Sequence, residues 1–189
     1  MKRLFLCSLV LALLLCAGCT PYSEIVPQTP LEVLEIGMYV LTGGKNPEPM
    51  IIGADGTPSP LSAPTGLAAE ISKQMTYEVV TMVESGDTAA AVMNITVPDA
   101  VALMYQALDG METYDEEAFV AAYEKLLANA PLTKTFTVDV QLQKVDGKWC
   151  MVMNDALSNA LTGGLMAEYN KIQQAILDKM TEGGADDAS

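Results

Sequence analysis

Apolar residues recur with two different periods between residues 29 and 182, and the changes of period divide the chain into elements. The first segment has the spacing of one face of an α-helix, in four residues: Leu31, Leu34, Met38 and Leu41. Thr29 at the N-cap, with Pro30 and Glu32 after it, forms a capping box, and Gly43 ends the segment. We therefore expect a helix at the start of the domain.

Two segments alternate between apolar and polar residues, as β-strands do. The first hairpin is expected to have strands at 77–83 and 88–97, with its turn at 84–87. The second alternates more strictly, with apolar residues on one face: Phe136, Val138, Val140 and Leu142. Asp146-Gly147 is a strong hairpin turn signal, and it returns the chain through Trp149 and Met151 on the same apolar face.

Helical spacing also occurs between and after the hairpins. A first helix is expected around 101–108, with Val101, Met104 and Leu108 on one face, and a second after a capping box at 113–116. The last helix has an apolar stripe of five residues: Leu165, Tyr169, Ile172, Ile176 and Met180. Residues 45–65, rich in proline, are expected to form a loop. Two hairpins with one polar face each, and helices to cover the other face, predict an α+β fold.

The first eighteen residues have the pattern of a secretory signal. Lys2 and Arg3 precede an apolar run at 4–15, which is too short to span a bilayer. Small residues and Cys19 follow. We expect a signal peptide at 1–18, an extended linker at 19–28, the α+β domain at 29–182 and an acidic tail at 183–189.

The sequence Leu15-Cys16-Ala17-Gly18-Cys19 resembles the lipobox of bacterial lipoproteins. The resemblance implies cleavage before Cys19, attachment of lipid to its sulfur and a location on the extracytoplasmic face of the cell membrane or the outer membrane. Two or more acyl chains anchor a protein stably. The alternative is an ordinary secretory signal that leaves Cys19 as a free thiol.

Composition excludes several kinds of chemistry. The chain has no histidine and only one arginine, Arg3, so histidine-based catalysis and histidine-ligated metal are ruled out. The net charge of −14 becomes −16 when Lys2 and Arg3 leave with the leader. Such a surface repels phosphate, so we expect no nucleic-acid partner. No pattern in the sequence calls for a cofactor or a metal ion.

The order of the expected elements, with KVDGKW at 144–149 and DALSNALTGGL at 155–165, resembles the nuclear transport factor 2-like or cystatin-like fold. More narrowly, it resembles small bacterial lipoproteins of unknown function built on that fold. The resemblance implies a curved antiparallel sheet packed on helices, with a cone-shaped cavity that relatives use for ligands, catalysis or dimerisation. Fold alone does not choose among these uses.

The residues that would line such a cavity are apolar and aromatic: Tyr39, Phe136, Val138, Trp149 and Met151. We interpret the chain as a binding or interaction module for a small apolar ligand or an envelope protein. One alternative is an isomerase-like or dehydratase-like enzyme that uses a carboxylate or tyrosine in the cavity. Another is a structural subunit that forms a homodimer through the open face of its sheet.

The candidate catalytic groups are few. Asp139 and Glu78 are the strand carboxylates, and alternation places Asp139 on the polar face. Tyr39, Tyr105 and Tyr123 are expected to pack where helices meet the sheet. Cys150, between Trp149 and Met151 but on the opposite strand face, is expected to be a buried structural thiol. These patterns favour a non-catalytic role.

Overall fold

The computed structural model describes residues 27–44, 49–53 and 55–183, with side chains up to residue 175. The signal peptide, Cys19 and most of the linker and tail lie outside these residues. The described strands are β1 (Met50–Ile52), β2 (Pro58–Pro60), β3 (Thr76–Ser85), β4 (Thr88–Pro98), β5 (Thr133–Val145) and β6 (Lys148–Val152). The described helices are α2 (Pro30–Leu41), α3 (Leu67–Ser72), α4 (Ala100–Asp109), α5 (Glu116–Asn129), α6 (Asp155–Leu161) and α7 (Leu165–Gly183).

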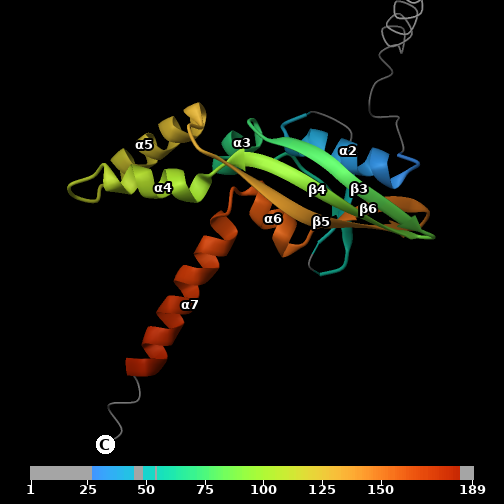
Figure 1. Ribbon diagram of the computed structural model, residues 1–189. Helices are drawn as coiled ribbons and strands as arrows, with labels where there is room; N and C mark the ends of the chain where they lie inside the picture. Colours follow the sequence, from blue (N-terminus) through green and yellow to red (C-terminus); the bar gives the residue numbers. More distant parts are fainter. Residues whose placement is uncertain (1–26, 45–48, 54, 184–189) are drawn as a thin grey trace, which may run out of the picture.

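The six strands form one mixed sheet in the order β2-β1-β6-β5-β4-β3. The two predicted hairpins, β3–β4 and β5–β6, are present and pair with each other through β4 and β5. The long strands β3, β4 and β5 curve along their length (Figure 1). The protein is therefore an α+β fold with a sheet packed with helices, as predicted.

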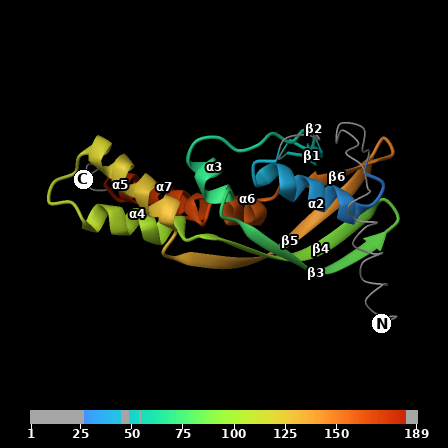
Figure 2. The ribbon, with the colours of Figure 1, turned by 90° about the horizontal axis from the view of Figure 1, so that it is seen from above.

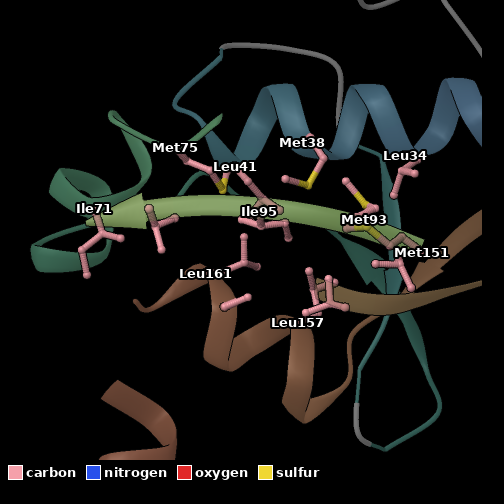
Figure 3. Close-up of a cluster of buried hydrophobic side chains, with 14 of the residues drawn as sticks. Leu34, Met38, Leu41, Ile71, Met75, Met93, Ile95, Met151, Leu157 and Leu161 are labelled. Atoms are coloured by element: carbon pink, nitrogen blue, oxygen red, sulfur yellow. The ribbon is translucent and has the colours of Figure 1, made fainter. Parts of the chain in front are cut away.

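One face of the sheet carries the core. The inward residues of β4 and β5 face each other across the two strands, as in the pairs Met93 with Val138 and Ala91 with Val140. Helices α2 and α6 place leucines and methionines against them, and the side chains of Leu34, Met38, Leu157 and Leu161 point toward one another with β4 and β6 residues between them (Figure 3). The sheet thus buries the apolar face that the alternation predicts.

The other face of β4 and β5 is polar. Thr96 and Thr135 share a hydrogen bond of 2.7 Å between their hydroxyls, and the Thr137 hydroxyl donates to Asn94 Oδ1 at 2.8 Å. Asp139 is exposed on the same face. Cross-strand pairs of this kind stabilise a sheet whose face is open to water.

The helical hairpin α4–α5 lies at the end of the long strands that is opposite the β3–β4 turn (Figure 2). The two helices are joined by buried Tyr123 of α5, whose hydroxyl donates to the carbonyl of Ala100 at the start of α4 at 3.0 Å. Leu103 and Leu127 are fully buried between the two helices and α3. This hairpin extends the core beyond the sheet.

Three expectations require correction. The sheet is mixed rather than antiparallel, because β1 pairs parallel to β6. Residues 45–65 are not all loop, because β1 and β2 form there and pair with each other. Helix α5 is capped by Asp115, whose Oδ1 accepts from Ala118 N at 2.8 Å, and not by Thr113. The capping box at Thr29 is confirmed.

Two helix faces also differ from expectation. The buried residues of α4 are Ala100, Leu103 and Ala107 rather than the row of Val101, Met104 and Leu108, which is half-buried. Of the three tyrosines expected at the sheet, only Tyr123 is buried, whereas Tyr39 and Tyr105 are exposed. A helix face with small residues can pack more closely than a face with large ones. The size of the apolar residues therefore does not predict by itself which face is buried.

Candidate functional site

The five residues predicted to line an apolar pocket lie in different settings. Val138, Trp149 and Met151 lie on the inner face of the sheet, and Trp149 is only 3% exposed. Trp149 pairs with Lys144 and Met151 with Leu142, which are six and four residues along β5 from Val138. Phe136 is half-buried toward the α6–α7 end of β5. Tyr39 is 44% exposed on α2. The structure places three of the five in the core but spreads them along one face of β5 and β6, and their role in ligand binding stays a prediction.

The space beside Met151 is tightly filled. A Cβ atom added to Gly37 of α2 would lie 3.2 Å from Met151 Cε, so the helix backbone rests directly on the methionine. Trp149 is packed under Lys144, whose ammonium lies 5.1 Å from the ring centroid. An apolar ligand at this place would therefore have to displace side chains of the core.

A polar groove of about 240 Å³ lies where α4, α6 and α7 meet the start of β5. Its charged and polar lining comes from five side chains: Asp99, Lys134, Asn159, Glu168 and Lys171. None of the five predicted pocket residues lines it. The groove combines two carboxylates, two ammonium groups and one amide, which suits the binding of charged or hydrogen-bonding groups.

The chain forms this groove through a turn of two glycines. Gly163 and Gly164 have φ angles of +62° and +92°, a region that side chains other than glycine rarely adopt. A Cβ on Gly163 would lie 2.6 Å from the Pro98 carbonyl oxygen. Asn159 then caps the next helix, because its Oδ1 accepts from Ala167 N at 2.8 Å. The turn therefore fixes where α7 begins and how the groove is bordered.

Glu168 is the most strongly held charge in the groove. The Tyr105 hydroxyl donates to Glu168 Oε1 at 2.8 Å, and Lys171 Nζ lies 3.2 Å from Oε2. The hydrogen bond from Tyr105, followed by the interaction with Lys171, lowers the pKa of Glu168. The same hydrogen bond raises the pKa of Tyr105. The charges of Glu168 and Lys171 thus compensate each other.

Lys134 is different, because it makes no ion pair within the described part of the chain. Its ammonium lies 5.1 Å from the centroid of the Phe136 ring, a cation–π contact. Asp99 uses Oδ1 to accept from Ala102 N at 3.1 Å at the start of α4. Lys134 is therefore the cation that the groove offers to a partner.

The interior offers little for acid–base chemistry. Among the described residues no acidic or basic side chain is buried, and both Asp139 and Glu78 are exposed. Burial raises the pKa of Tyr123 to about 12, and its hydroxyl already donates to a carbonyl. The groups considered for catalysis thus do not meet inside the fold.

Cys150 is buried at 2% exposure, as predicted, on the strand face opposite Trp149 and Met151. Burial, aided by the nearby Asp146 carboxylate, raises the pKa of the Cys150 thiol. A thiol held protonated is a poor nucleophile. The structure thus assigns Cys150 a packing role.

Neither a metal site nor a membrane span is evident in the described ranges. No three acidic or cysteine side chains there come close enough to hold a metal ion. No described helix combines the length and the apolar character needed to cross a bilayer.

The sequence did not reveal the groove, because its lining comes from four elements distant along the chain. The one local signal is the glycine pair after α6, which marks a sharp turn without indicating what the turn brings together. The chain matches no protein-family model, no curated protein and no solved structure. The arguments for function therefore come from the chain itself.

Proposed function

We propose that the protein is a bacterial lipoprotein, anchored through lipid on Cys19 to the extracytoplasmic face of the cell membrane or the outer membrane, where it acts as a binding module. The sequence at 15–19 and the basic start at Lys2 and Arg3 support this anchoring. The described fold begins at the N-cap Thr29, ten residues after Cys19, which leaves a short linker between lipid and domain. We also propose the nuclear transport factor 2-like fold type for the domain.

The observation that carries the binding role is that no charged side chain is buried among the residues whose side chains the structure describes. An enzyme of the alternative kind needs a carboxylate or tyrosine that faces a substrate inside the cavity. In the described residues no aspartate or glutamate is buried, and the buried Tyr123 hydroxyl is already hydrogen-bonded. A role in binding at the surface therefore fits these side chains better than catalysis inside the fold.

The groove at α4, α6 and α7 is the proposed contact site. Lys134, which has no ion-pair partner among the described residues, would pair with a carboxylate or another anionic group of a ligand or an envelope protein, and Asp99 would accept a hydrogen bond nearby. The five apolar residues predicted from the sequence remain a second candidate, because a pliable methionine-containing core can open around an apolar ligand.

The anchoring is tested by labelling the chain in a bacterial host with a radioactive fatty acid. Cys19→Ser should abolish the label and release the protein from the membrane fraction. Cys7→Ser is the matched control, because it changes a cysteine of the signal peptide outside the sequence at 15–19 and should keep both label and sedimentation. A Cys19→Ser chain that stays labelled and membrane-bound contradicts the anchoring.

The contact site is tested by placing a photo-crosslinking amino acid at position 134 in the membrane-bound chain. A discrete adduct with an envelope component should form there. Position 125, a lysine on α5 outside the groove, is the control and should give no such adduct. No adduct at 134, or the same adduct at both positions, argues against the groove as the contact site.

A further inference from the structure

Strand β3 forms one edge of the sheet. Within the described residues it pairs with β4 alone, and no described helix lies beyond it (Figure 2). Eight of its ten residues are exposed. In an antiparallel ladder only alternate residues of a strand bond to a given neighbour, so the backbone groups of the other residues of β3 point outward. Such an edge can pair with a strand from another chain.

The two edges of the sheet differ in how they are protected. The opposite edge, β2, has three residues, of which Pro58 and Pro60 lack the N–H that a further strand would need. Strand β3 has ten residues and contains neither proline nor lysine, the residues that commonly block an edge. Its one irregularity is a bulge between Val79 and Thr81. Strand β3 is therefore the edge that can accept a strand.

The surroundings of this edge are acidic on both faces of the sheet. Glu84 pairs with buried Ala89 and so lies on the inner face, whereas Glu78 pairs with Asn94 on the polar outer face. Helix α2 and strands β3 and β4 together contain no lysine or arginine. They contain four glutamates, all exposed: Glu32, Glu35, Glu78 and Glu84. A strand added to β3 would therefore meet carboxylates on either side.

Apolar side chains accompany these carboxylates. Val80 and Val83 of β3 are 50% and 68% exposed, and Tyr77 is exposed as well. Burial, followed by the Glu35 carboxylate of α2, raises the pKa of Tyr77, which indicates that the carboxylate lies near the ring. The edge thus offers apolar contacts and negative charge to the side chains of an added strand.

Charge indicates which strand fits. A second copy of β3 would bring the same glutamates and no cation, so the two edges would repel each other. The linker and the tail, residues 19–28 and 184–189, hold three acids and no lysine. Neither a second copy nor these segments can neutralise the carboxylates. A strand that carries lysine or arginine, from another protein, can.

We propose that β3 binds an extended basic segment of another protein as an additional strand of the sheet. The backbone hydrogen bonds give the affinity, whereas lysine or arginine opposite Glu78 and Glu84 and apolar residues on Val80 and Val83 give the selectivity. This inference is independent of the lipid anchor. It is also independent of the groove at Lys134, because no groove-lining residue belongs to β3.

The test uses the purified full-length chain with Cys19→Ser in detergent and a fluorescent peptide of alternating lysine and valine, as long as β3. Fluorescence anisotropy should show binding, and hydrogen exchange should slow at the amides of β3 that do not bond to β4. The same peptide with alternate amides N-methylated keeps its charge but cannot form the ladder. It should bind about tenfold more weakly or worse.

Two double variants separate the charges of the edge from the net charge. Glu78→Lys with Glu84→Lys should weaken binding of the lysine–valine peptide by about tenfold and favour a glutamate–valine peptide instead. Glu117→Lys with Glu124→Lys is the control, because it changes two exposed glutamates of α5 and alters the net charge equally. It should change the affinity by less than about twofold. Trp149 fluorescence checks that each variant remains folded.

Three outcomes would overturn the proposal. Equal binding of the N-methylated peptide would mean that ionic attraction alone holds the peptide. Equal losses in the two double variants would assign the binding to the net charge. Slow exchange at all amides of β3 before any peptide is added would mean that the edge is already covered, and the solution mass would then distinguish a second copy from a segment of the same chain.

Discussion

Helices α2 and α7 have similar apolar stripes but opposite surroundings. Both carry leucines, methionines or aromatic residues at intervals of three and four. In α2, Leu34 and Met38 are completely buried against the sheet (Figure 3). In α7, Tyr169 is 57% and Ile172 is 47% exposed. An apolar stripe along a helix therefore does not show whether the rest of the chain covers it.

The difference arises from how each helix is connected. Helix α2 is followed by β1, which pairs with β6, and α2 itself packs on β6. Helix α7 follows the turn at Gly163 and Gly164, which directs it away from the end of the sheet (Figure 1). The position of each helix in the fold thus makes the stripe of α2 part of the core and leaves the stripe of α7 exposed to solvent.

The largest expected difference between the two helices is in stability. Leu34→Ala should lower the free energy of unfolding by about 3 to 5 kcal/mol, because it leaves a cavity between α2 and the sheet. Ile172→Ala should change it by less than about 0.5 kcal/mol, since the side chain is half in water. Urea unfolding followed by Trp149 fluorescence, at low protein concentration, measures both. Equal losses would mean that α7 belongs to the core.

Local signals predicted much of this fold. The capping box at Thr29, the Asp146-Gly147 turn and the alternation along β5 depend on residues close together in sequence, and each is present in the structure. Strands β1 and β2 have three residues each, and β2 is Pro-Ser-Pro, so neither has a readable period. Their existence depends on the parallel pairing with β6, a contact of residues about 100 apart.

The candidate site was harder to predict than the fold. Alternation correctly placed Val138, Trp149 and Met151 on the apolar face, but it contains no information on how much volume the helices fill there. The approach of Gly37 to Met151 depends on the position of α2, which is a tertiary property. The charged groove depends likewise on where the glycine turn directs α7.

The next largest loss of stability is expected at the glycine turn between α6 and α7. Gly163→Ala should cost about 2 to 3 kcal/mol, because it combines a positive φ with a clash against the Pro98 carbonyl. Gly43→Ala after α2 also has a positive φ but nothing within 4 Å of the added carbon, so about 1 kcal/mol is expected. Thermal unfolding of the two variants compares them. A loss at Gly43 as large as at Gly163 would contradict the clash.

The hairpin α4–α5 contains a buried tyrosine, Tyr123, whose ionisation makes the stability depend on pH. Burial raises the pKa of Tyr123 from 10.0 to about 12, so the folded state binds its proton more tightly than the unfolded state. The stability from neutral Tyr123 is complete below pH 10 and is lost as the pH rises toward 12. The loss should be on the order of 2 kcal/mol. Unfolding measured between pH 9 and 12 should show it.

Two variants check the origin of that pH dependence. Tyr123→Phe should flatten the decline while it costs about 1 kcal/mol at neutral pH, because the hydrogen bond to Ala100 is lost. Tyr114→Phe, at an exposed tyrosine, should leave the decline in place. A decline that persists unchanged in Tyr123→Phe would assign it to other groups.

The smallest expected effects come from removing the N-terminal capping side chains of α2 and α7. Thr29→Ala removes the acceptor for Glu32 N and should lower the free energy of unfolding by about 1 kcal/mol, because α2 is part of the core. Asn159→Ala removes the acceptor for Ala167 N, and it should speed hydrogen exchange of the first amides of α7 while the urea midpoint moves by less than half as much. Thr29→Ser is the control: it keeps the hydroxyl, so the urea midpoint should not change. If Asn159→Ala instead shifts the midpoint as far as Thr29→Ala does, α7 unfolds together with the body, and the contrast between the two helices is one of exposure alone.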